Sequence, residues 1–197
     1  MKNKGNFEKN FSVFLVFVVT LSFFLFFFES FILTGNVTEG STVSNVTISK
    51  YLAISFGSNL SQGIQFGNVN SLPATDINAT HNYDGSNESS TFFISVSNDS
   101  NTAIDFCIKG NAGLTSSALD VIGLGNETYS NSTVTNSTDP LLSSQTALTT
   151  SYAKSGLNVA VGANEYWRFW LDIPSSQPSG DYNNTISFKG VVAALSC

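Results

Sequence analysis

Beyond residue 35, apolar and polar side chains alternate in short runs, and no segment keeps the 3.6-residue apolar period of a helix. Clusters of Gly, Asn, Ser and Pro separate these runs, as turns separate strands. Strands are therefore predicted within the ranges 46–56, 91–98, 102–110, 119–124, 157–162, 165–174 and 180–197. This pattern predicts an all-β domain, built as a single antiparallel β-sandwich of the jelly-roll or immunoglobulin-like kind.

The two-residue period of a strand assigns side chains to faces. The apolar face of 102–110 holds Ile104, Phe106 and Ile108, and the opposite face holds Asp105, Cys107 and Lys109. Cys107 is therefore expected near the surface. The apolar face of 157–162 holds Leu157, Val159 and Val161.

The range 165–174 is the most aromatic of these runs. Its inward side chains are predicted to be Trp167, Phe169, Leu171 and Ile173, and its outward ones Tyr166, Arg168, Trp170 and Asp172. The outward Tyr166 and Trp170 form either a sugar-binding platform or a stripe that a neighbouring loop or subunit covers.

The N-terminus has a different pattern. Lys2, Lys4 and Lys9 precede an uncharged apolar run at 11–28, which is typical of a segment that routes a chain to export with its N-terminus inside. Residues 1–35 are therefore interpreted as a signal peptide or a membrane anchor, and the run's length leaves both open. A third reading is a type IV pilin precursor, because a Lys-Gly pair stands before the apolar run.

Charge is scarce in this chain. Charged residues make up 11% of the sequence and the net charge is −6, with only five basic residues beyond residue 35. Without a basic patch, nucleic acid and anionic membrane surfaces are poor candidate partners. We expect the chain to contact the membrane only during export or, if residues 1–35 are retained, through this anchor.

Asn-x-Ser/Thr sequons are frequent in the exported part. Either they reflect composition alone, or a glycan coat replaces charge as the solubilising surface, and we favour the coat. Residues 126–151 are interpreted as an exposed, glycosylated loop, with a short edge strand as an option. The predicted glycosylation sites are Asn36, Asn45, Asn59, Asn78, Asn87, Asn98, Asn126, Asn131, Asn136 and Asn183.

Two cysteines, Cys107 and Cys197, allow one disulfide pairing, and export would permit it. The alternative is two unpaired thiols, because spacing alone cannot bring their Cα atoms within bridging range.

Catalytic chemistry has little support in the sequence. His81 stands alone in a loop, and the nucleophile and metalloprotease motifs are missing. A calcium loop at 76–88 is the alternative to a turn, and we favour the turn because Asn-Asp-Gly runs are mostly turns; the calcium ligands would be the oxygens of Asp76, Asp84, Asn87 and Glu88. We therefore predict no catalytic residue, no metal site and no cofactor, and no enzyme activity.

Two segments carry a family resemblance. One is YLAISFGSNLSQGIQFGNVNSLPATDINATHN (51–82), a strand followed by a Gly-Ile-x-Phe-Gly step and a Pro-containing loop. The other is NEYWRFWLDIPSSQPSGDYNNTISFKGVV (164–192), an aromatic strand with a Trp-Leu-Asp-Ile-Pro exit. Together they resemble archaeal exported filament subunits of the thread and bundling-pilus family, which are related in fold to the bacterial biofilm fibre protein TasA.

This resemblance implies a jelly-roll or Ig-like subunit whose N-terminal segment pairs in a groove of the next copy, by donor-strand complementation. Residues 36–49 would be the donor, ahead of a β-sandwich at 50–197. The partners would be copies of the same chain in a head-to-tail polymer. The candidate groove-filling side chains are Val43, Val46 and Ile48.

The expected function is therefore a structural subunit of an extracellular filament used in adhesion or biofilm. The alternative is a membrane-anchored cell-surface glycoprotein whose β-sandwich binds a ligand or an envelope partner. An exported hydrolase or carbohydrate-binding module has the least support, because no cluster of titratable residues marks a site.

Overall fold

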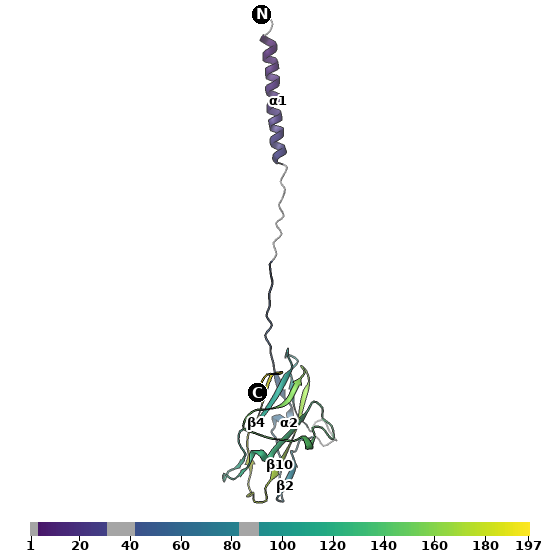
Figure 1. Ribbon diagram of the computed structural model, residues 1–197, viewed down its shortest axis with the longest axis vertical. Coiled ribbons are helices and arrows are strands. Elements are labelled where there is room, and N and C mark those ends of the chain that lie inside the picture. The colour runs from purple at the N-terminus through teal and green to yellow at the C-terminus, as the bar shows by residue number, and fades with distance from the viewer. Residues whose placement is uncertain (1–3, 31–41, 83–90) are drawn as a thin grey trace. The chain divides into compact units, whose positions relative to one another are not determined.

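The computed structural model describes residues 4–30, 42–82 and 91–197, and the chain divides into two compact units. The first unit, Met1–Thr47, contains helix α1 (Lys4–Ser30), which forms over the apolar run (Figure 1). Within the described residues, no helix has both the length and the apolar character that crossing a membrane demands.

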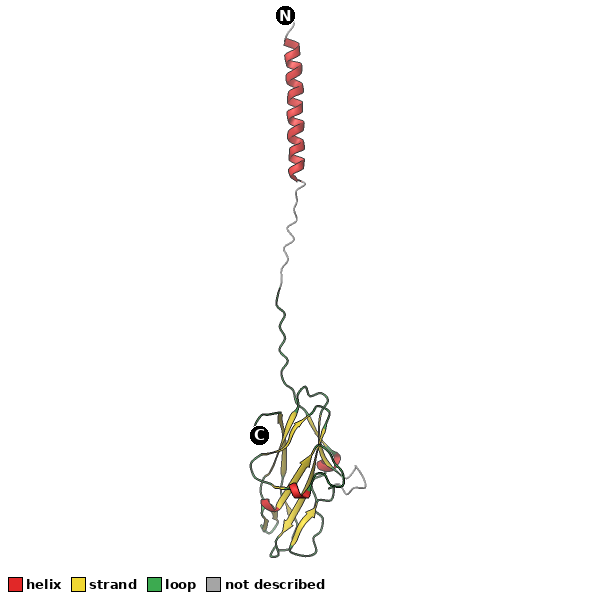
Figure 2. Cartoon of the chain, turned by 45° about the vertical axis from the view of Figure 1, so that its right-hand side comes forward, coloured by secondary structure: helices red, strands yellow, loops and turns green. Residues whose placement is uncertain are grey.

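The second unit, Ile48–Cys197, holds all the described strands, and its helices are single short turns (Figure 2). In chain order the elements are β1 (Ile54–Phe56), α2 (Ser58–Ser61), β2 (Ala74–Asn78), β3 (Phe92–Val96), β4 (Ile104–Gly110), β5 (Leu114–Ser116), β6 (Val121–Ile122), η1 (Leu124–Asn126), β7 (Glu127–Ser132), η2 (Leu142–Ser144), β8 (Thr146–Ala147), β9 (Ala153–Val159), β10 (Asn164–Ile173), β11 (Tyr182–Asn183) and β12 (Ile186–Val192). The described fold is thus mostly β, as predicted.

All the strand pairs are antiparallel, and they form three sheets. In the largest, strand order is β1-β3-β10-β7-β8, and β2 also pairs with β10. The long β10 is central because β3 pairs with its first half, β2 with its second half, and β7 with its other edge. Two three-stranded sheets complete the unit, with orders β12-β4-β9 and β11-β5-β6.

The core is built from aromatic rings that meet edge to face. The ring of Trp167 on β10 lies 5.4 Å from that of Phe106 on β4 and 5.3 Å from that of Phe188 on β12, measured between centroids. Phe169, also on β10, lies 5.5 Å from Phe92 on β3. Such T-shaped pairs add to the energy of burial itself. These contacts join β10 to the strands of a second sheet.

Two strand predictions follow the sequence pattern closely. In β3 the predicted face of Phe92, Ile94 and Val96 is buried, and in β4 so is the predicted face of Ile104, Phe106 and Ile108. The short strand expected within 119–124 is β6.

The prediction of one strand over 46–56 is wrong for most of that range. Only Ile54–Phe56 is a strand, and the described residues 42–50 form neither helix nor strand. Just before β1, side chains add to the backbone bonds: the Ser97 N–H donates to the Ala53 carbonyl and the Asn101 N–H to the Tyr51 carbonyl. The Ser100 hydroxyl accepts from the Ala53 N–H at 2.9 Å, and the Asn101 amide oxygen accepts from the Tyr51 N–H at 2.7 Å.

The option of a short edge strand within 126–151 is confirmed by β8, which pairs only with β7 among the described strands. The prediction of an exposed loop is wrong for residues 127–132. They form β7, which pairs with β10 over six positions, and Glu127, Tyr129 and Ser130 are buried. The Asn- and Ser-rich composition conceals an ordinary strand, because hydrogen bonds to β10 satisfy its backbone.

Three side-chain placements also differ from the prediction. Cys107 is fully buried, because the C-terminal residues bond to this side of β4. Of the apolar face predicted for 157–162 only Val159 is buried, while Leu157 is 65% exposed, because a register irregularity and a positive φ of 54° at Asn158 interrupt the alternation. Trp170 is 3% exposed, so it cannot serve as a sugar-binding platform in this fold.

Candidate functional site

The second unit has an open groove of about 990 Å³ among its described residues. Two irregular segments, 63–72 and 177–185, form its rim. Its apolar floor comes from β5, β6 and the end of β10, through Leu114, Ile122 and Leu171, which pack together. Few charges line it, so the groove fits apolar side chains better than a charged ligand.

Two edge strands, β1 and β12, border this groove through Phe56 and Phe188, whose rings lie 5.7 Å apart. β1 pairs with β3 alone and β12 with β4 alone, so among the described residues each has a free edge. Two residues further along β12, Gly190 lets Ile54 of β1 approach, since a Cβ at Gly190 would lie 3.3 Å from the Ile54 Cγ2. The two sheets thus come together on this side without joining their ladders.

A buried carboxyl group, that of Glu127 on β7, lines the groove. Its side chain is 1% exposed, and its Oε2 accepts a hydrogen bond of 2.7 Å from the Asn184 Nδ2. Burial raises the pKa of Glu127 from 4.5 to about 7, and the Asn184 hydrogen bond only partly opposes this. Asn184 also donates to the Ala112 carbonyl, so it fastens the segment before β12 to two neighbours.

A second buried carboxyl, that of Glu165 on β10, lies away from the groove lining. Its Oε1 accepts from the Asn131 Nδ2 at 2.6 Å, while its Oε2 has no hydrogen-bond partner among the described residues. Burial raises the pKa of Glu165, which allows the protonated oxygen to remain inside.

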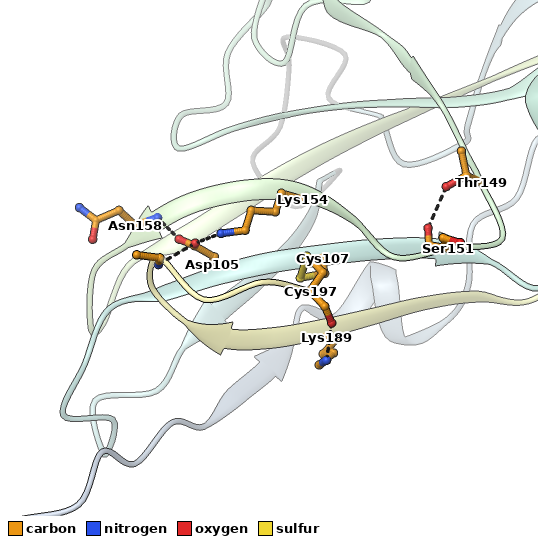
Figure 3. The surroundings of a disulfide bond; sticks show 9 residues. Asp105, Cys107, Thr149, Ser151, Lys154, Asn158, Lys189 and Cys197 are labelled. Carbon is orange, nitrogen blue, oxygen red and sulfur yellow. Dashed lines mark hydrogen bonds and ion pairs between the residues drawn. A yellow bond between two sulfur atoms is a disulfide. The ribbon is translucent and has the colours of Figure 1, made fainter.

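The other side of β4 is closed by a clamp on the C-terminal residues, drawn in Figure 3. Cys107 and Cys197 form a disulfide with a Cα–Cα distance of 6.0 Å, which resolves the two alternatives for these cysteines. Asp105 accepts from the Lys154 Nζ at 2.5 Å and from the backbone N–H groups of Asn158 and Ala194 at 2.7 and 2.9 Å.

The charge state of Asp105 follows from these partners. Burial alone would raise its pKa, but the hydrogen bonds from Lys154, Asn158 and Ala194 outweigh burial and lower the pKa below 3.8. The Lys189 Nζ also donates to the Cys197 carbonyl at 2.6 Å. The clamp therefore combines a covalent bond, an ion pair and hydrogen bonds to the chain's last residues.

The residues that the sequence analysis considered for catalysis or calcium binding have ordinary partners where they are described. His81 packs edge-on against Phe92, at 5.9 Å between ring centroids. Asp76 accepts from the Gln145 Nε2, while Asp84, Asn87 and Glu88, the other candidate calcium ligands, lie outside the described residues. In the part of the chain that is described, no three His, Cys, Asp or Glu side chains gather where they could hold a metal ion.

The aromatic pair on β10 is partnered within the chain. The Trp170 Nε1 donates to the Asn78 Oδ1 at 2.9 Å, and the ring of Tyr166 packs 6.0 Å from that of Phe93. Of the two alternatives for this stripe, coverage by a neighbouring strand therefore describes Trp170.

The described sequon asparagines are either buried, half-buried or exposed. Asn36 and Asn87 lie outside the described residues. Asn59 is buried, and Asn126, Asn131 and Asn136 are half-buried. The exposed ones are Asn45, Asn78, Asn98 and Asn183.

The candidate donor side chains are all exposed. Val43, Val46 and Ile48 are 82%, 86% and 79% exposed, on a stretch without regular structure. An extended chain would place Val46 and Ile48 on one face and Val43 on the other.

Sequence reasoning missed the most unusual residues of this site. Glu127 stands inside a sequon, Asn126-Glu127-Thr128, where composition indicates a loop. The available signal was the alternation of Glu127 with Tyr129, which share the inward face of β7. Asn184 carries no local signal, because its role depends on a partner 57 residues away.

Comparison with known proteins adds no relative to this picture. The chain matches no protein-family model, and no curated protein matches it.

Proposed function

We propose that this protein is a structural subunit of an extracellular, glycosylated filament, in which each copy lends an N-terminal strand to the groove of the next. The observation that carries the proposal is the groove with an apolar floor beside two edge strands, β1 and β12, whose outer edges are unpaired among the described residues. Unpaired edges invite strand addition, and a head-to-tail contact that does not close produces a filament.

The domain in this proposal is a β-sandwich. Support comes from the ring contacts that Trp167 on β10 makes with Phe106 on β4 and Phe188 on β12. Facing sheets bury their aromatic side chains in this way. The groove then corresponds to the incompletely closed side of the sandwich.

Residues 43–48 suit the donor role by pattern. Six extended residues span about 20 Å, comparable to the seven-residue β12. If Val46 and Ile48 face the groove, Asn45 and Val43 point away from it. A glycan on Asn45 is then compatible with a donor strand, because its side chain would stand outside the interface.

Export is part of the same proposal. Residues 1–35 would direct the chain across the membrane, and the Cys107–Cys197 disulfide suits an oxidising compartment. The low charge content suits a surface that glycans keep in solution.

Complementary variants of the exported protein test the assembly. Val46→Asp/Ile48→Asp spoils the donor and leaves the groove intact, while Phe56→Asp spoils the groove and leaves the donor intact. Each variant alone should stay monomeric by light scattering and electron microscopy. A mixture of the two should yield only capped dimers, because one competent donor meets one competent groove.

The matched control is Val43→Asp, which places the same charge on the opposite face of the donor and should still polymerise. Filaments from the Val46→Asp/Ile48→Asp variant would contradict the proposal. Monomers alone from the wild-type protein would contradict it too, and would favour the anchored surface glycoprotein.

A further inference from the structure

The sequons differ in whether the fold leaves their reactive groups free. A glycan is attached to the Asn Nδ2, and the motif also requires a Ser or Thr two residues later. A transferase that acts on the folded chain must therefore reach both the amide and the hydroxyl. Hydrogen bonds that already engage either group within the fold should hinder the reaction.

Three sequons have the amide engaged. The Asn59 Nδ2 donates to the buried Thr91 carbonyl at 3.2 Å. The Asn131 Nδ2 donates to Glu165 at 2.6 Å, and the Asn136 Nδ2 donates to Asp139 at 3.0 Å. Each amide would keep one N–H after attachment, but the glycan would have to enter the space beside a hydrogen bond that the fold already uses, and displacing that bond is costly for a buried partner.

Three more sequons have the hydroxyl engaged. In the Asn78 sequon, the Thr80 hydroxyl donates to the Gln65 carbonyl at 2.5 Å. In the Asn98 sequon, the buried Ser100 hydroxyl donates to the Ala53 carbonyl and accepts from the Ala53 N–H. In the Asn126 sequon, the Thr128 hydroxyl donates to the Gln145 side chain at 2.5 Å.

Two described sequons remain free at both positions. Asn45 and Thr47 are exposed and extended, and no hydrogen bond joins their side chains to the described residues. Asn183 and Thr185 are exposed at the end of β11 and just before β12. The Thr185 backbone N–H donates to the Asn111 side chain, which holds the segment still while its hydroxyl stays free.

We propose that, of the eight described sequons beyond residue 35, the folded chain is glycosylated at Asn45 and Asn183 alone. The donor would be a glycan whose anomeric carbon carries a lipid diphosphate. The Asn Nδ2 forms a bond to that carbon, the bond from the carbon to the diphosphate oxygen breaks, and the nitrogen gives up one proton. The diphosphate leaves with the electron pair. The proposal rests on the export part of the proposed function and not on the filament.

Asn183 has a particular location. Together with Asn184 and Thr185 it lies on the rim of the groove. A glycan there stands beside the start of β12, at one end of the surface that a donor strand would use. Asn45, in contrast, belongs to the candidate donor itself. The two open sequons would thus place one glycan on each partner of the same contact.

Glycopeptide mass spectrometry of the exported full-length protein tests the proposal. We expect glycan mass on Asn45 and Asn183 and none on the other six described sequon asparagines beyond residue 35. Thr185→Val, which removes only the hydroxyl, should abolish occupancy at Asn183, and Thr185→Ser should restore it. Asn131→Gln is the matched control, and its glycan mass should equal that of the wild-type protein.

The second arm uses the unglycosylated protein, a purified oligosaccharyltransferase and a lipid-diphosphate-linked glycan. Native protein should be modified at Asn45 and Asn183, and reduced, unfolded protein should gain the other sites. Glycans on Asn59 or Asn131 of the native protein, or none on Asn183, would overturn the inference. Correct glycans on a protein that forms no filaments would leave this inference standing and refute the assembly proposal.

Discussion

Two buried carboxyl groups, Asp105 on β4 and Glu127 on β7, have opposite surroundings. Asp105 accepts three hydrogen bonds, one of them from a lysine, and its pKa lies below 3.8. Glu127 accepts one hydrogen bond from a neutral amide, and its pKa rises to about 7. The comparison shows that the carboxylate on the clamped side finds its hydrogen-bond donors and its counter-ion within the chain. The carboxyl group on the groove side is buried with a single donor and lines an open groove.

The two groups also give stability opposite dependences on pH. Folded Glu127 holds its proton more tightly than the unfolded chain does, so its contribution is full below pH 4.5 and is lost as the pH rises through 7. Folded Asp105 holds its proton less tightly, so its contribution is present above pH 3.8 and is lost as the pH falls through the lower folded value.

The largest expected effect comes from opening the clamp. Cys107→Ala/Cys197→Ala should lower the free energy of unfolding by about 4 kcal/mol, because the disulfide closes a loop with a sequence separation of 90 residues. The melting temperature should fall by roughly 10 °C in calorimetry. A loss below about 1 kcal/mol would mean that the ion pair and hydrogen bonds hold the C-terminal residues without the bond.

The groove side is tested next by Glu127→Gln, which keeps the shape of the side chain and removes its proton equilibrium. In the wild-type protein this group should cost up to about 3 kcal/mol of stability between pH 4 and pH 8. Urea unfolding across that range should show a flatter dependence in the variant. An unchanged slope would show that Glu127 is not the acid responsible.

Asp105→Asn probes the clamped side with the same kind of change. It should cost about 2 kcal/mol at pH 7, because the charge-assisted bond from Lys154 is lost and one backbone donor loses its acceptor. Unfolding measurements down to pH 2 should bring wild type and variant together, since the wild-type carboxyl is then protonated. A constant difference at every pH would assign the cost to packing and not to charge.

The smallest expected effect belongs to Asn184→Ala, which removes the only described donor to Glu127. Stability should fall by about 1 kcal/mol. The apparent pKa of Glu127 should move above its wild-type value, because the lost bond had favoured the charged form. Titration followed by carboxyl NMR shifts measures this, and a downward shift would contradict the described contact.

Sequence reasoning predicted strands where the two-residue period is backed by large apolar side chains. For β3 and β4 the inward faces follow directly from Phe92, Ile94, Ile104 and Phe106. It failed where burial comes from elsewhere in the chain. Trp170 is covered by Asn78, which comes from a strand far away in the sequence, and Cys107 is covered by the C-terminal residues.

The candidate site was less predictable than the fold for the same reason. The groove depends on how the segments 63–72 and 177–185 pass over the end of β10, and neither carries a periodic signal. Sequons could be counted from the sequence, but their accessibility could not. The sequence around Asn131 is the same whether its amide faces water or, as here, a carboxyl group 34 residues away.

The disulfide also sets how the domain would respond to tension. A pull between residue 48 and Cys197 passes directly from Cys197 to Cys107, so the 90 residues of separation between them carry no load. Only residues 48–106 can be drawn out, at about 3.5 Å each, or roughly 200 Å in total. When the domain is stretched from its ends, its maximum length is therefore fixed. More than half of its residues lie inside the loop that the disulfide closes, and they cannot extend while that bond is intact.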